Sequence, residues 1–274
     1  MAVSIADIKK LRELTGAGMS DCKKALEVSE GDFDKAVEEI RKKGQAVAAK
    51  REARDAAEGT VVAAAEGDFA AIIALKCETD FVATNDRFVG LANKILSLVM
   101  ANKPQTIDEV LALPTEDGTV KDSIVAQIGV TGEKMELGAY EFISGTSTIA
   151  YNHMNHKLST LIAFNQENVD VQVAKDVAMQ AAAMNPVATT REEIPAEIVA
   201  RELEIAKEKA REEGKPEAML EKIAMGRLGK FYKESALMEQ EFIKDAKLTV
   251  AQYLDASSKG LVATSFKRVN LNAD

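Results

Sequence analysis

Aromatic residues are scarce in this sequence of 274 residues. They make up 5% of the chain, and tryptophan is absent. The apolar fraction is nevertheless 46%, which is normal for a globular protein and excludes a chain that is disordered throughout. Because alanine and methionine supply much of that fraction, we expect helix-rich packing. The length allows one or two domains.

Cysteines and long apolar runs are also lacking. The two cysteines, Cys22 and Cys77, are too few for a secreted disulfide scaffold and fit the reducing cytoplasm, where they are expected to be small buried hydrophobic residues. No apolar run approaches the ~18 residues that span a bilayer. The first residues lack the apolar stretch of a signal peptide. We therefore expect a cytoplasmic protein that does not bind membranes.

The signatures of common enzymes are missing as well. No GxxxxGK, GxGxxG, HExxH or GxSxG pattern occurs, and the only histidines are His153 and His156. No cysteine or carboxylate stands at ligand spacing beside them, so a contact in an exposed turn, or no role, is favoured over a zinc site. We expect a binding protein without enzymatic activity or cofactor. An enzyme that uses carboxylates or lysine is the alternative.

A positive field over the whole chain is lacking too. The net charge is −9 and the isoelectric point is near 5.1, which argues against direct nucleic-acid binding. The charge is uneven, since residues 1–54 carry +2 and the remainder carries −11. The basic residues of the first segment could bind an acidic partner. A solvated helix face is the simpler interpretation.

Three short helices are predicted in residues 1–50. Apolar residues recur at helical spacing at Ile5, Ile8, Leu11 and Leu14. Two glycines among residues 15–18 break the first helix, and the third helix is expected to end near Gly44. Residues 51–58 are interpreted as a linker.

After the linker the sequence changes to a mixed pattern that occurs twice. Residues 61–65 and 69–75 predict a β-hairpin, followed by helices and by an extended segment at 135–143. A second hairpin at 148–151 and 158–164 is followed by a helix and, much later, by a strand at 261–269. We infer an α+β protein with two similar subdomains, residues 59–145 and residues 146–186 with 233–274, each containing an antiparallel three-stranded sheet and arising by duplication.

Residues 187–232 form the largest insertion. The spacing of residues 190–193 suggests a capping box, and two apolar stripes joined by Gly214 predict an antiparallel helical hairpin. Such a hairpin could be an interaction arm, or it could pack on its own subdomain, and these two interpretations have equal weight.

Thr79, Asp80, Phe81 and Val82 form the most distinctive short segment, between a predicted strand and a predicted helix. An acidic side chain beside an aromatic ring suits a wedge that enters a partner. The simpler interpretation is that Phe81 staples the helix entry and Asp80 caps the helix. The matching connection in the second half, residues 165–168, contains no aromatic residue.

Several motifs, taken in order, resemble bacterial elongation factor Ts along essentially the whole chain. They are residues 11–19, 21–26, 77–82, 151–153, 183–186, 213–216 and 226–228. The resemblance implies guanine-nucleotide exchange on elongation factor Tu, a GTPase of translation elongation. The chain departs from the family at residues 133–137, where Glu-Lys-Met-Glu-Leu replaces a usual Arg-bearing strand, and at residues 157–159.

The resemblance also implies roles for single residues in the N-terminal half. The three-helix unit would have a ubiquitin-associated-like (UBA-like) fold that docks on the nucleotide domain of the GTPase, with Leu11, Arg12 and Met19 as contacts. Residues 79–82 would dislodge Mg²⁺. In that step Phe81 would wedge between two GTPase helices, and Asp80 would support the intrusion.

Further contacts implied by the resemblance lie in the core. Ile128, Gly129 and His153 would bind elsewhere on the GTPase. The helical hairpin corresponds to the family's coiled-coil arm, through which some members form homodimers.

Overall fold

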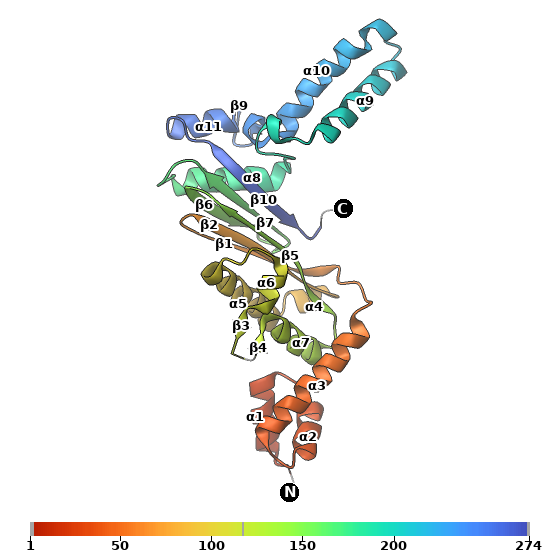
Figure 1. The fold of residues 1–274 in the computed structure, drawn as a ribbon, viewed down its shortest axis with the longest axis vertical. Helices are drawn as coiled ribbons and strands as arrows, with labels where there is room; N and C mark the ends of the chain where they lie inside the picture. The colour runs from red at the N-terminus through yellow and green to blue at the C-terminus, as the bar shows by residue number, and fades with distance from the viewer. Residues whose placement is uncertain (1–2, 117, 273–274) are drawn as a thin grey trace. The chain divides into compact units, whose positions relative to one another are not determined.

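The computed structural model describes residues 3–116 and 118–272, and its helices and strands divide between two compact units (Figure 1). One unit is built mainly from residues up to 62 together with residues 73–140. The other comprises residues 63–72 and 141–270. Both contain helices and strands, which confirms the α+β class.

Helices α1 (Ile5–Thr15), α2 (Met19–Val28) and α3 (Phe33–Arg51) form the predicted three-helix unit. The Ser4 hydroxyl accepts a hydrogen bond from the Asp7 amide and begins α1, and Gly16 ends it with a φ of 75°. The inward residues of the unit include Ile8, Leu11, Cys22, Leu26 and Ala36.

The prediction that the third helix ends near Gly44 was wrong, because α3 continues to Arg51. Alanine, lysine and glutamine after Gly44 favour a helix, and the glycine is used for packing instead. Helix α3 packs against α7 (Val120–Thr131), and a Cβ atom placed on Gly44 would lie 3.6 Å from the Gly129 Cα. The two glycines therefore mark the place where these helix backbones come closest.

The first sheet has the strand order β1-β2-β5, with β1 at Glu58–Glu66, β2 at Phe69–Cys77 and β5 at Met135–Ser144. The hairpin and the third strand were predicted and are confirmed. Between β2 and β5 the chain forms α4 (Asp80–Ala83), α5 (Asp86–Asn102), α6 (Ile107–Ala112), the short strands β3 (Pro114–Thr115) and β4 (Gly118–Thr119), and α7.

The second sheet has the antiparallel order β10-β7-β6, with β6 at Ser147–Asn152, β7 at Leu158–Phe164 and β10 at Ala263–Asn270. In both sheets the third strand pairs with the second strand of the hairpin, as the predicted repeat requires. Helix α8 (Val171–Met184) packs on β6 and β7. The unpredicted strands β8 (Glu241–Phe242) and β9 (Asp245–Thr249) precede α11 (Val250–Ser257).

Helices α9 (Ala196–Glu212) and α10 (Glu217–Ser235) form a helical hairpin. Its inner face is made of small and medium side chains, among them Ala206, Ala210, Leu220, Ala224 and Leu228. The predicted capping box was wrong: Thr190 makes no cap, and residues Arg191–Glu193 form a short 3-10 helix instead. The helix begins only after Pro195, whose ring fixes φ in a range suited to a helix start. Within the described residues, none of the helices combines the length and the apolarity needed to cross a bilayer.

Candidate functional site

The predicted wedge segment forms one helical turn at the end of a buried strand. Thr79 follows β2 and is the N-cap of α4, with its hydroxyl accepting a hydrogen bond from the Val82 amide at 3.4 Å. The Ala83 amide donates to the Thr79 carbonyl at 3.1 Å and closes the turn. Thr79 rather than Asp80 is therefore the cap, so the simpler interpretation was wrong on this point.

Phe81 is exposed on this turn. Its relative exposure is 84%, and it is the only exposed one of the nine phenylalanines, all of which lie in the described part of the chain. A staple would require a buried ring, so that interpretation was wrong too. Asp80 is also exposed. The segment thus presents an apolar ring and a neighbouring carboxylate to solvent, on a turn whose backbone is fixed by hydrogen bonds.

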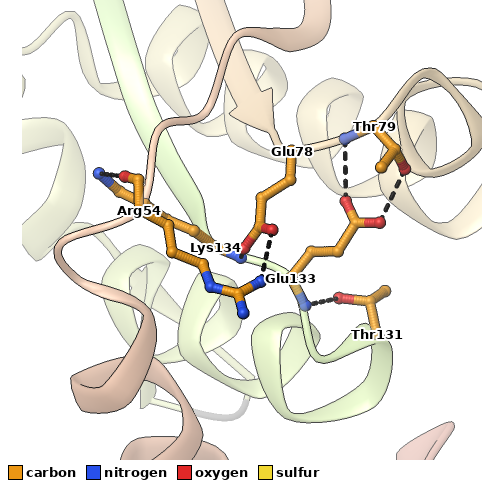
Figure 2. Close-up of polar contacts among 6 residues, drawn as sticks. All are labelled: Arg54, Glu78, Thr79, Thr131, Glu133 and Lys134. Atoms are coloured by element: carbon orange, nitrogen blue, oxygen red, sulfur yellow. Dashed lines mark hydrogen bonds and ion pairs between the residues drawn. The ribbon is translucent and has the colours of Figure 1, made fainter.

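Glu133 holds the base of this turn from the loop between α7 and β5 (Figure 2). One of its carboxylate oxygens accepts a hydrogen bond from the Thr79 amide at 3.1 Å, and the other accepts a hydrogen bond from the Thr79 hydroxyl at 2.7 Å. Sequence reasoning missed this residue. The available signal was the departure from the family pattern at residues 133–137, which carried no indication of a partner 54 residues earlier.

A second carboxylate, Glu78, joins the same two segments in the opposite direction. It accepts the Lys134 amide at 2.7 Å and the Arg54 guanidinium at 2.8 Å. The backbone hydrogen bond from Lys134 is the main cause of a lowered pKa for Glu78, with Arg54 contributing further. The backbone carbonyl of Arg54 in turn accepts a hydrogen bond from the Lys134 ammonium at 2.9 Å. Two acidic and two basic residues therefore join the start of α4 and the α3–β1 connection to one loop.

The predicted contacts of the three-helix unit lie in different environments. Leu11 is fully buried, whereas Arg12 and Met19 are exposed. Met19 begins α2, immediately after the turn that follows Gly16. Leu11 can shape this surface only through the packing of α1, and the partner-binding roles of all three residues stay predictions.

Ile128 and Gly129 lie on α7 and take part in packing. Ile128 is buried, and Gly129 faces α3. These packing roles explain the residue types without a partner, so their predicted role in binding also stays a prediction.

His153 lies in the turn between β6 and β7. Its Nδ1 atom is 3.0 Å from the Tyr151 hydroxyl, and its amide donates to the Leu158 carbonyl at 2.9 Å. Between it and His156, whose φ is +52°, stands Met154 with a relative exposure of 90%. Sequence reasoning passed over Met154, although a methionine in an otherwise polar turn was the signal available.

The cysteines and histidines give no arrangement suited to a metal. Cys22 and Cys77 are buried thiols outside any disulfide, as expected. Across residues 3–116 and 118–272, no group of three or more histidine, cysteine, aspartate or glutamate side chains is placed to hold an ion. What the described site offers is an exposed aromatic ring beside an exposed carboxylate, on a turn that is fixed by hydrogen bonds.

Known proteins resemble this chain over its whole length. The family described as Elongation factor TS matches residues 78–273. Proteins called Elongation factor Ts are 59% identical over 275 residues in Porphyromonas gingivalis, 50% over 274 residues in Azobacteroides pseudotrichonymphae and 51% over 277 residues in Amoebophilus asiaticus. Each of these matches covers all of both chains.

Proposed function

Because the chain belongs to the elongation factor Ts family, we propose that it is a guanine-nucleotide exchange factor for elongation factor Tu in translation elongation. In this proposal it binds the GDP-bound GTPase, promotes GDP release and leaves a nucleotide-free complex that GTP then enters. It makes and breaks no covalent bond, works in the cytoplasm, and contacts neither nucleic acid nor membrane directly.

One observation carries the proposal: Phe81 is exposed on a turn whose backbone is fixed. An aromatic ring held in water by a structured turn has apolar surface that a partner can bury. We assign to residues Thr79, Asp80, Phe81 and Val82 the disturbance of the Mg²⁺ site of the GTPase. Phe81 enters between two helices of the partner, and Asp80 engages polar groups at the point of entry.

The physics of exchange is a coupling between two binding events. In the GTPase, Mg²⁺ offsets the charge of the nucleotide phosphates, so displacing it weakens GDP binding. The coupling is reciprocal, because a factor that weakens GDP binding is itself bound more weakly when GDP is present. The factor therefore needs only binding energy, delivered at the right place.

The remaining surfaces serve the same complex in this proposal. The three-helix unit, with a UBA-like fold, docks on the nucleotide domain through a surface that includes Arg12 and Met19. The turn with His153 grips the GTPase elsewhere, and Ile128 and Gly129 form a further contact region. The helical hairpin α9–α10 acts as a coiled-coil arm and is the candidate homodimer contact.

The size of the Phe81 contribution follows from its exposure. Burying most of a phenylalanine ring that is 84% exposed stabilises a complex by about 2 kcal/mol, which corresponds to roughly thirtyfold in an equilibrium constant. Phe81→Ala should therefore slow stimulated GDP release by at least about tenfold at sub-saturating concentrations. The fold should be unaffected, because the ring is not part of a core.

The test measures release of a fluorescent GDP derivative from elongation factor Tu, with and without the protein. Wild type is expected to accelerate release, Phe81→Ala to do so poorly, and Val171→Ala, which shortens another exposed apolar side chain, to match wild type. If wild type binds the GTPase yet leaves release unchanged, the protein is a binding scaffold and the proposal is wrong. If wild type accelerates release and Phe81→Ala does so equally well, the wedge assignment fails.

A further inference from the structure

The turn that carries Phe81 is held by hydrogen bonds between two pairs of consecutive residues, and each pair contributes one carboxylate. Glu78 and Thr79 belong to the β2–α4 junction, and Glu133 and Lys134 belong to the α7–β5 loop. Glu133 accepts two hydrogen bonds from Thr79, while Glu78 accepts the amide of Lys134 (Figure 2). The two segments are thus bonded in both directions across a separation of more than fifty residues.

The Thr79 hydroxyl has two functions in this arrangement. It donates its proton to Glu133 at 2.7 Å and accepts the Val82 amide, which caps α4. A hydroxyl can rotate, so its acceptor lone pairs face Val82 only while its proton is directed elsewhere. Glu133 supplies that direction, and it also binds the Thr79 amide. The cap of the turn therefore depends on a carboxylate outside the turn.

Hydrogen bonds at the end of α7 fix the backbone of Glu133. Helix α7 ends at Thr131 and is capped by Gly132, which has a left-handed φ of 75° and whose amide donates a hydrogen bond to the Ile128 carbonyl. The Glu133 amide then donates to the Thr131 hydroxyl at 3.2 Å, and that hydroxyl donates to the Gln127 carbonyl at 3.1 Å. The Glu133 backbone is consequently fixed to the end of a helix, and its side chain spans the distance to Thr79.

We propose that Glu133 is a positioning residue for nucleotide exchange, acting through Thr79 to keep the Phe81 turn in the conformation that enters the partner. This inference rests on the proposed function. Glu133 itself is half-buried behind the turn and need not touch the partner.

The expected effect is a smaller binding-competent fraction. Glu133→Ala removes both acceptors from Thr79, so the turn samples other conformations and apparent affinity falls in proportion to the competent fraction. We expect stimulated GDP release at sub-saturating concentration to slow by about tenfold. The amides of Thr79 and Val82 should exchange hydrogen faster in the free protein, because both lose a fixed acceptor.

Two further variants separate geometry from charge. Glu133→Gln keeps a side-chain oxygen at the same reach, and its two lone pairs can still accept a hydrogen bond from the Thr79 hydroxyl and direct that proton away from Val82, so the variant should retain most of the activity. Glu133→Asp keeps the charge but is one methylene shorter, so it should behave like the alanine variant. Glu136→Ala is the matched control, because Glu136 lies three residues further along the chain, on β5, and pairs with Lys76 and Lys134 instead of Thr79.

The decisive experiment combines these variants with Phe81→Ala in the full-length protein, with elongation factor Tu and fluorescent GDP as the probe. If Glu133 acts through the Phe81 turn, Glu133→Ala slows release in the wild-type background and has little further effect in the Phe81→Ala background. A general loss of structure would slow release equally in both backgrounds. That result would overturn the proposal.

Other outcomes are equally informative. If Phe81→Ala slows release and Glu133→Ala does not, the positioning role is wrong while the proposed function stands. If Phe81→Ala itself has no effect, the wedge assignment fails and this inference fails with it. Should the alanine variant not fold, Glu133→Asp and Glu133→Gln still decide the matter, because equal activity of the two would contradict a geometric role.

Discussion

Replacing Gly129 with alanine should weaken the packing of α3 against α7. A Cβ atom built on Gly129 would lie 2.8 Å from the Gly44 Cα, closer than side-chain carbons approach a backbone atom. The neighbour is backbone rather than a flexible side chain, so the helices must separate to make room. Overpacking of this kind costs about 1–3 kcal/mol.

The same substitution also brings a gain, which sets the net size of the effect. Alanine is favoured over glycine in a helix by about 1 kcal/mol. The expected net loss for Gly129→Ala is therefore up to about 2 kcal/mol. Gly44→Ala should be milder, because its Cβ would meet the Val125 carbonyl oxygen at 3.2 Å and a small shift relieves the contact. Gly90→Ala on α5 meets nothing within 4 Å and should stabilise the protein.

Urea unfolding followed by far-UV circular dichroism measures these differences, which suits a chain without tryptophan. The order of stability should be Gly90→Ala, then wild type and Gly44→Ala, then Gly129→Ala. Hydrogen exchange at the end of α3 should increase in the Gly129→Ala variant alone. If Gly129→Ala proves as stable as Gly90→Ala, the close approach of α3 and α7 is not as described.

Two further predictions concern buried ionisable groups. Burial alone would raise the pKa of Asp176, but hydrogen bonds from side chains that include Lys244 and Tyr253 outweigh it and lower that pKa. The stabilisation is therefore complete above the unfolded-state pKa of about 3.9 and is lost as the pH falls through the lower folded value. In urea titrations from about pH 5 to about pH 3, wild type should lose its advantage over Asp176→Asn, and a constant difference would contradict this. Both thiols are buried, and burial raises the pKa of Cys22. Ellman's reagent should therefore label Cys22 and Cys77 only after unfolding. Rapid labelling of the native protein would refute the buried placement of these thiols.

Local sequence patterns were sufficient for most of the fold. Helical spacing of apolar residues located the three N-terminal helices, and pairs of short apolar runs separated by turn residues located both hairpins. The repeated order of hairpin, helix and third strand predicted two sheets of the same connectivity, and in both sheets the third strand pairs with the second strand of the hairpin. Strands β8 and β9 escaped prediction, since the two residues of β8 carry no measurable period.

Errors arose where distant residues decide the local structure. Gly44 resembled a helix end, yet it is the contact point for Gly129 on another helix. Thr79 and Asp80 are adjacent and both residue types suit an N-cap, and the sequence-based interpretation named Asp80, whereas the cap is Thr79. The choice depends on where β2 ends and on Glu133, which lies 54 residues away. Exposure of Phe81 likewise depends on how α4 packs, since Ala83 is the residue of this turn that is buried, and short-range patterns do not report that packing.

A measurement of the reciprocal coupling between nucleotide and factor decides whether the protein is an exchange factor. The dissociation constant of GDP for elongation factor Tu is measured with and without saturating protein, and that of the protein is measured with and without saturating GDP. An exchange factor requires that each ligand weakens the binding of the other by the same factor, well above one, and Phe81→Ala should bring that factor towards one. If the protein binds GDP-loaded and nucleotide-free elongation factor Tu equally tightly, it is not an exchange factor.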